Sequence, residues 1–159
     1  MRLVLFEPEI PPNTGNVARL CAATGTELHL IEPLGFRLEN RLLKRAGLDY
    51  WPRVDMHVWP DWRAFTLRPG RNPEERYVLM SARQRKSSVP IQHFAFEPDD
   101  CLVFGPETRG LPDSVLAASP LHVRIPMREG CVRSINLSTA AGIALYLALA
   151  RCSLLDSWS

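Results

Sequence analysis

Short apolar runs of four or five residues recur along the chain. They occupy residues 3–6, 27–31, 54–58, 76–80, 100–104 and 122–125. Such runs are typical of strands that are buried on both faces of a sheet. Segments with the composition of helices separate most of them. This alternation predicts the α/β class, with a mostly parallel sheet and helices on both faces.

The expected helices follow from caps and breakers. They cover residues 14–23, 38–46, 61–67, 114–118 and 136–151. Asn13 or Thr14 can cap the first helix, and Gly25 can end it. A length of 159 residues and a hydrophobic fraction of 46% suit a single domain over residues 1–159, with a core of its own.

The charge and the cysteines exclude several classes of protein. A net charge of +2 is too small to mark a nucleic-acid binder by itself, so any RNA site must come from local clusters. The four cysteines form no CxxC pair, and the histidines lack zinc spacing, so no metal is expected. The chain shows neither a signal peptide nor an apolar run of membrane-spanning length. We therefore expect a cytoplasmic protein that does not bind membranes.

Three loops follow strands and can form one ligand pocket. They begin near residues 79, 104 and 125. In open α/β sheets, ligands bind beyond the carboxyl ends of the strands. Gly105 lets the backbone approach a ligand, while Leu79, Ile125 and Leu137 can supply apolar walls. Neither GxGxxG nor a P-loop is present, so the loops do not indicate a phosphate cradle. On these grounds alone, an ordinary strand–turn–helix is an equal alternative.

Two of these loops, together with residues 13–19, resemble the sequence motifs of a known superfamily. Residues 13–19 (NTGNVAR), 104–112 (FGPETRGLP) and 125–127 (IPM) with 133–138 (RSINLS) resemble the three motifs of the SPOUT RNA methyltransferases, in order and spacing. Residues 6–16 and 45–50 resemble its small TrmL type, which methylates the ribose of the tRNA wobble nucleotide. The resemblance implies S-adenosyl-L-methionine as cofactor, S-adenosyl-L-homocysteine as product, and the anticodon stem-loop of tRNA as partner.

The resemblance also implies a particular architecture. Members have a SPOUT-type α/β fold with a C-terminal trefoil knot. They form homodimers with the cofactor pocket beside the subunit interface. The segment 136–151 is apolar around its whole circumference, as expected for a helix buried on more than one face. The alternative is that this helix packs entirely within one subunit.

Residue roles come from the matched positions of the motifs. Leu79, Gly105, Ile125 and Ser134 match cofactor-contacting positions, several of which act through the backbone. The catalytic candidates are Arg19, Asn16 and Asn136.

Arg19 matches the catalytic arginine of the superfamily. It can act as the base that activates the ribose hydroxyl. Because guanidinium stays protonated in proteins, it can instead act electrostatically, with a phosphate oxygen or a water taking the proton. Both roles remain open at this stage, as does a structural ion pair.

Further expectations concern the second and third motifs and the RNA contacts. Glu107 and Arg109 can form an ion pair, and Ser138 can cap the last helix or donate to the substrate.

Arg41 and Arg45 share a helix face with Arg37 and are the candidates for substrate binding; residues 83–86 form a second basic cluster. A solvated charged face is the alternative for both clusters. Aromatic residues 50, 51, 59 and 62 can stack on a base, although core packing is favoured.

Two other functions fit the same residues. The first is a SPOUT 2′-O-methyltransferase that acts on rRNA or at another tRNA position. Such relatives often carry an added RNA-binding domain, which this chain lacks. The second is a non-catalytic RNA-binding module that retains the fold. Intact motifs, Arg19 included, favour the enzyme.

Overall fold

The computed structural model describes residues 1–39, 50–82 and 87–158. In these residues seven parallel strands form one sheet, in the order β3-β2-β1-β6-β4-β7-β5. The strands are β1 (Arg2–Phe6), β2 (Glu27–Ile31), β3 (Met56–Trp59), β4 (Tyr77–Met80), β5 (Val89–Pro90), β6 (Cys101–Phe104) and β7 (His122–Arg124). The predicted α/β class with a mostly parallel sheet is confirmed.

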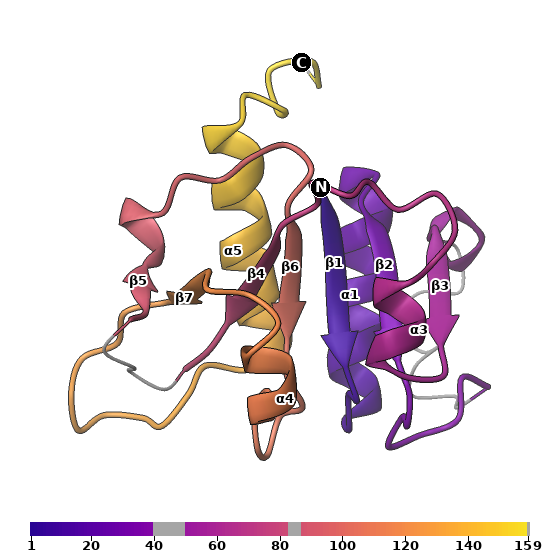
Figure 1. Ribbon diagram of the computed structural model, residues 1–159, viewed down its shortest axis with the longest axis horizontal. Coiled ribbons are helices and arrows are strands. Elements are labelled where there is room, and N and C mark those ends of the chain that lie inside the picture. The colour runs from indigo at the N-terminus through magenta and orange to yellow at the C-terminus, as the bar shows by residue number, and fades with distance from the viewer. Residues whose placement is uncertain (40–49, 83–86, 159) are drawn as a thin grey trace.

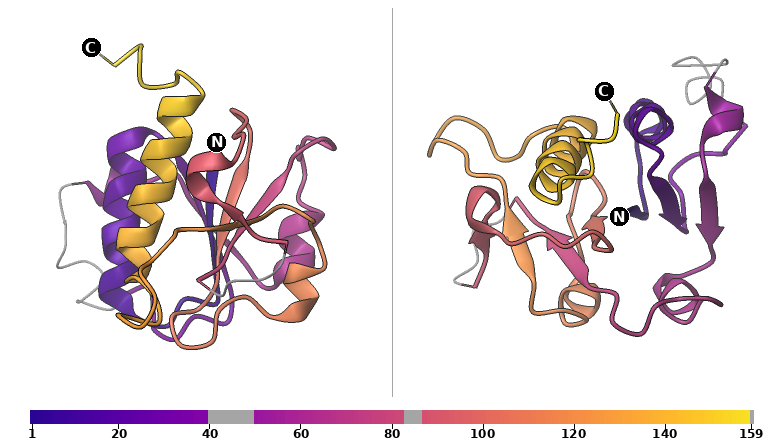
Figure 2. Two further views of the ribbon diagram at one scale, coloured as in Figure 1. Left: turned by 90° about the vertical axis from the view of Figure 1, so that its left-hand side faces the viewer. Right: turned by 90° about the horizontal axis from the view of Figure 1, so that it is seen from above.

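Helices cover both faces of this sheet (Figures 1 and 2). The longest two, α1 (Pro11–Thr24) and α5 (Leu137–Arg151), lie side by side on one face. On the opposite face lie α3 (Trp62–Thr66) and α4 (Asp113–Leu116). Two short 3-10 helices, η1 (Trp51–Arg53) and η2 (Ile91–His93), complete the described helices.

Side chains alternate between two apolar cores, because successive residues of a strand point to opposite faces. In β1, Leu3 and Leu5 belong to the core beneath α1 and α5. Val4 and Phe6 belong to the core beneath α3 and α4. The same alternation in β4 and β6 decides which side chains can reach a ligand at the edge of the sheet.

The first helix begins earlier than predicted. α1 starts at Pro11, and its N-cap Ile10 makes no side-chain hydrogen bond. Proline suits a first turn because the missing N–H has no helical partner there. The prediction that Asn13 or Thr14 caps the helix is therefore wrong, and both residues are buried within it. Gly25 ends the helix in the left-handed conformation, as predicted.

Other boundaries differ by a few residues. β3 begins at Met56 rather than at residue 54, and the two-residue strand β5 lies outside the six predicted runs. Asp61, the first residue of the predicted helix 61–67, caps α3, since its Oδ1 accepts from the Ala64 N–H at 2.7 Å. Most of the predicted helix 38–46 lies outside the described residues.

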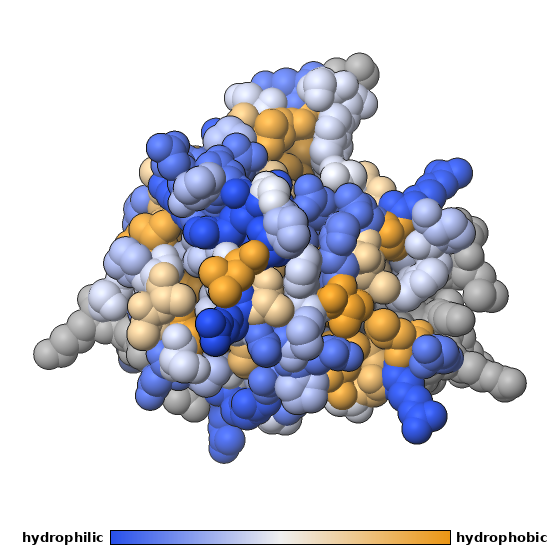
Figure 3. Space-filling model, turned by 45° about the vertical axis from the view of Figure 1, so that its right-hand side comes forward, coloured by the Kyte–Doolittle hydropathy of each residue, from blue (hydrophilic) through white to orange (hydrophobic). Residues whose placement is uncertain are grey.

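One face of the surface is mainly polar. On the face turned toward the viewer in Figure 3, hydrophilic residues predominate and hydrophobic residues emerge in small groups. None of the helices in the described residues is both long and apolar enough to cross a bilayer.

Candidate active site

A cavity of about 550 Å³ lies at the carboxyl edge of the sheet, beyond β4, β6 and β7. All three loops expected from the sequence contribute to its wall. The lining includes residues 80–82, 104–111, 125, 127 and 133–137, together with residues 10, 13, 116 and 140. The cavity thus occupies the position at which open α/β sheets bind ligands.

The structure brings most of the predicted cofactor-contacting residues together. Gly105, Ile125 and Ser134 line the cavity, but Leu79 does not. Leu79 is fully buried in the core beneath α3 and α4, and its neighbour Met80 lines the cavity instead. The expectation that the Leu79 side chain forms a wall is therefore wrong, because the alternation of β4 turns it away. A contact through its backbone stays a prediction.

Gly105 is required by the close approach of the chain to itself. A Cβ atom at this position would lie 2.3 Å from the Leu111 nitrogen and 2.5 Å from the Gly110 carbonyl carbon. Both are backbone atoms, so no side-chain movement could relieve the clash. The absence of a side chain at Gly105 therefore permits the loop after β6 to fold back and form the cavity wall.

A hydrogen-bonded series of polar side chains joins the three motif segments. Asn136 Nδ2 donates to Asn13 Oδ1 at 2.8 Å, and Asn13 Nδ2 donates to Glu107 Oε1 at 3.1 Å. Glu107 also accepts from the backbone N–H groups of Glu9 at 2.8 Å and Ile10 at 3.1 Å. Residues far apart in the sequence thereby hold the start of α1, the β6 loop and the start of α5 in one arrangement.

Asn136 also caps α5. Its Oδ1 accepts from the backbone N–H groups of Ser138 at 2.9 Å and Thr139 at 3.3 Å. The Ser138 hydroxyl donates to the same oxygen at 2.7 Å. Capping of the last helix therefore belongs to Asn136, and the prediction that Ser138 is the cap is wrong.

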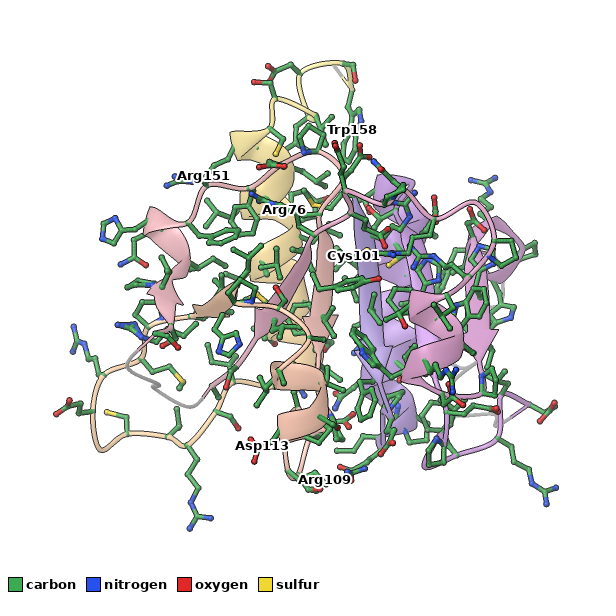
Figure 4. All side chains as sticks on the ribbon, viewed as in Figure 1. Arg76, Cys101, Arg109, Asp113, Arg151 and Trp158 are labelled. Atoms are coloured by element: carbon green, nitrogen blue, oxygen red, sulfur yellow. The ribbon has the colours of Figure 1, made fainter. Side chains whose placement is uncertain are left out.

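The expected ion pair between Glu107 and Arg109 does not form. Arg109 instead pairs with Glu7 at the end of β1. Glu107 is directed to backbone N–H groups and to Asn13, which satisfy its carboxylate. Figure 4 shows Arg109 at the carboxyl edge of the sheet, far from Cys101 at the other end of β6.

The remaining catalytic candidates lie outside the cavity of their own chain. Asn16 and Arg19 are exposed on α1, and neither lines the cavity. The Arg19 guanidinium lies 5.5 Å from the ring centroid of Tyr50. Tyr50 is itself buried and donates to the Gly15 carbonyl at 2.8 Å. The predicted RNA contacts Arg41 and Arg45 lie outside the described residues.

Two of the four cysteines are buried thiols of low reactivity. Burial raises the pKa of Cys21 to about 12, and burial followed by the nearby Glu75 carboxylate raises the pKa of Cys101. Thiols of this kind are poor nucleophiles. No group of three histidine, cysteine, aspartate or glutamate side chains in the described residues could hold a metal ion.

Sequence reasoning missed Asn13 and underestimated Glu107. A signal for Asn13 was available, since Asn13, Val17 and Cys21 recur at a spacing of four and all three are buried. Asn16 does not share this face. A polar residue within the apolar stripe of a helix indicates a buried hydrogen bond, whereas an exposed one does not.

Comparison with known proteins identifies the family of this chain. Residues 1–146 match the SpoU rRNA Methylase family.

The chain belongs to the SpoU methylase family.

Several relatives and one solved structure align with most of the chain. A tRNA (cytidine(34)-2'-O)-methyltransferase from Methylovorus glucosotrophus is 49% identical over 91% of this chain and 90% of its own length. The Escherichia coli K12 protein of the same name is 45% identical over 92% and 90%. A structure described as giving insights into the 2-OH methylation of C/U34 on tRNA has a TM-score of 0.86 and 47% identity, with 96% of this chain and 95% of that chain covered.

Proposed function

We propose that this SpoU-family enzyme transfers a methyl group from S-adenosyl-L-methionine to the ribose 2′-hydroxyl of the tRNA wobble nucleotide, a cytidine or a uridine. The observation that carries the proposal is the meeting of the three motif segments at one cavity, with Glu107, Asn13 and Asn136 bonded in series. Relatives named for methylation of cytidine 34 match more than nine-tenths of the chain. Their substrate therefore gives the most specific assignment.

The cavity suits the proposed cofactor. Its volume of about 550 Å³ lies within the usual range for small-molecule sites. Met80, Ile125 and Leu137 provide apolar surface for an adenine ring, and the loop backbone supplies polar groups. No phosphate cradle is required, because this cofactor carries no phosphate. When bound, it supplies a methyl group attached to positively charged sulfur.

The described residues would orient the reactants and support charge development. The Asn136–Asn13–Glu107 series keeps the loops in fixed positions, which lowers the entropic cost of alignment. We assign Arg19 the electrostatic role: it holds an RNA phosphate and stabilises the developing negative charge on the ribose oxygen. A guanidinium is a poor base, so a phosphate oxygen or water takes the proton.

The active unit is proposed to be a cytoplasmic homodimer. Arg19 does not line the cavity of its own chain, and α5 exposes Ile143 and Tyr146 beside α1. Pairing of two copies through this face would bury these apolar groups. It would also bring Arg19 of one copy toward the cavity of the other. The anticodon stem-loop would then contact both copies, with Arg41 and Arg45 as predicted phosphate contacts.

The decisive experiment is methylation of total tRNA from a strain that lacks this enzyme, followed by mapping of the modified nucleotide. We expect a single 2′-O-methylated nucleotide at the wobble position. A methylated base, or a site elsewhere in tRNA, would contradict the assignment. Methylation of rRNA but not tRNA would favour the other SPOUT specificity, and binding of RNA without methylation would favour the non-catalytic module.

Arg19 provides a direct test of the chemistry. Arg19→Ala should lower single-turnover methylation by about 100-fold or more, the usual effect of losing one electrostatic contact to developing charge. Affinity for S-adenosylhomocysteine, measured by isothermal titration calorimetry, should stay unchanged, because Arg19 is assigned to the RNA phosphate and the ribose oxygen and not to the cofactor. Weaker cofactor binding with normal single-turnover chemistry would exclude this role.

A further inference from the structure

The loop after β1 and the loop after β6 hold each other by reciprocal hydrogen bonds. The Glu9 carboxylate accepts from the Thr108 N–H at 3.0 Å and from the Thr108 hydroxyl at 2.8 Å. In return, the Glu107 carboxylate accepts from the N–H groups of Glu9 and Ile10. Each loop thus gives the other one carboxylate and two donors. Hydrogen bonds to a charged acceptor are stronger than neutral ones, so this reciprocal set is a strong connection.

The backbone beside Glu9 is held by a third loop, the one after β2. The Gly35 N–H donates to the Pro8 carbonyl at 2.9 Å. A Cβ atom on Gly35 would lie 2.8 Å from the Glu9 Cα, so the two backbones are in direct contact. The loop after β2 therefore limits movement of Glu9 away from Thr108.

An ion pair between Arg109 and Glu7 adds a further connection on the same side. Glu7 has a φ of 47°, which is uncommon for a residue with a side chain. Such a conformation persists where the surroundings determine it. At this position, those surroundings include the hydrogen bond from the Glu7 N–H to the Ile31 carbonyl at 2.9 Å and the pairing with Arg109.

The two hydrogen-bonded residues, Thr108 and Glu9, differ in whether they line the cavity. Thr108 and the rest of the β6 loop line the cavity, whereas Glu9 does not. Glu9 is partly buried and touches the loop at both Thr108 donors. Glu9 itself therefore does not reach the cavity, and its carboxylate contacts the cavity wall at Thr108. We propose that Glu9 is a positioning residue that fixes the β6 loop in its cofactor-binding form. This inference rests on the proposed function.

The test separates positioning from general stability. Glu9→Gln removes the charge and one of the two acceptor oxygens, and Thr108→Val removes only the hydroxyl. Each variant should bind S-adenosylhomocysteine about tenfold more weakly by isothermal titration calorimetry, equivalent to about 1.4 kcal/mol. KM for S-adenosylmethionine should rise by a similar factor, while kcat at saturating cofactor and the melting temperature stay close to wild type. Glu74→Gln, an exposed carboxylate before β4, is the charge-matched control and should behave as wild type.

A double-mutant cycle identifies the contact itself. The Glu9→Gln/Thr108→Val protein should lose little more affinity than either single variant, since both remove the same interaction. Thr108→Ser, which keeps the hydroxyl, should restore most of the affinity. Unchanged affinity in Glu9→Gln would overturn the role of Glu9. A fall in both kcat and melting temperature in Glu9→Gln would overturn it too, because it would indicate a general structural effect. Failure of the wild-type protein to bind S-adenosylhomocysteine would instead overturn the proposed function.

Discussion

Asn13 and Asn16 lie three residues apart in one helix and have opposite environments. Asn13 is 6% exposed and makes two side-chain hydrogen bonds, to Glu107 and Asn136. Asn13→Ala should therefore lower the free energy of unfolding by about 1–3 kcal/mol and weaken cofactor binding, because it leaves Glu107 and Asn136 without a shared partner. Asn16→Ala, as the matched control, should change stability by less than about 0.5 kcal/mol. Urea unfolding and calorimetry would measure both effects. A larger effect on cofactor binding from Asn16→Ala would contradict this assignment.

His29 gives the protein a pH-dependent stability. Burial, with the nearby positive charge of Arg68 and the neighbouring His57, lowers the pKa of His29 to about 4. The Trp59 Nε1 donates to its Nδ1 at 3.0 Å, which is compatible with the neutral ring. Since the unfolded state, with a histidine pKa of about 6.5, binds the proton more readily, this contribution to stability is present above pH 6.5 and is lost as the pH falls toward 4.

The expected loss from His29 is about 3 kcal/mol between these limits. His29→Gln can retain hydrogen bonds to Trp59 and Glu27 but does not titrate. Its unfolding free energy should therefore fall less than that of the wild type between pH 7 and pH 4. His93→Gln, which replaces an exposed histidine, should keep the wild-type pH dependence. Parallel curves for the wild type and His29→Gln in urea titrations would show that His29 does not carry the effect.

The role of a residue could be predicted from the sequence where it depends on neighbouring residues, and not where it depends on a distant partner. Gly105 could be selected from the sequence, because a close approach of the backbone requires glycine, whereas the cap of α5 was assigned to Ser138 and not to Asn136. The Glu107–Asn13 bond joins residues 94 positions apart, and the Asn136–Asn13 bond joins residues 123 apart. No local pattern specifies such pairs. The predicted pairing of Glu107 with Arg109 failed for this reason, since it assumed that neighbouring charges meet.

At the scale of elements, two adjacent residues of β4 have different roles, one in core packing and one in the wall of the cavity. Leu79 is fully buried beneath α3 and α4, whereas Met80 lines the cavity on the other face. Leu79→Ala should lower the free energy of unfolding by about 3 kcal/mol and leave cofactor affinity near that of the wild type, because the backbone is retained. Met80→Ala should lower both the free energy of unfolding and the affinity for the cofactor. The opposite pattern in urea unfolding and calorimetry would place Leu79, not Met80, at the cofactor.

The elements themselves were largely predictable, whereas their exact limits were not. Apolar runs identified six strands to within about two residues, because buried parallel strands are apolar throughout. α1 began three residues early, since prolines at its first turn replaced the expected side-chain cap. β5 comprises Val89–Pro90, too short a segment to have a recognisable period. The order of strands in the sheet depends on contacts between distant segments, which composition does not encode.

At the scale of the whole molecule, the strand order explains where the site forms. β1 lies between β2 and β6, so its carboxyl end is adjacent to loops from both halves of the sheet. Glu7 and Glu9 follow β1 and contact the β6 loop, while Pro8 contacts the β2 loop. The cavity is thus supported by the residues that follow β1 and not only by the strands whose loops line it. The trefoil knot and the single-domain organisation implied by the sequence stay predictions.

The proposed homodimer makes the most demanding prediction, because it assigns Arg19 to the cavity of the other copy. A chain with Arg19→Ala keeps its cavity, and a chain with Gly105→Val keeps Arg19 but blocks its own β6 loop. Each variant alone should be nearly inactive. When the two are unfolded, mixed in equal amounts and refolded, half of the dimers should contain one intact cavity served by one intact arginine. Activity should then recover to roughly a quarter of the wild-type level. No recovery, with mixed dimers verified by affinity tags on each chain, would show that Arg19 serves its own chain, because only action between subunits can combine the two intact parts.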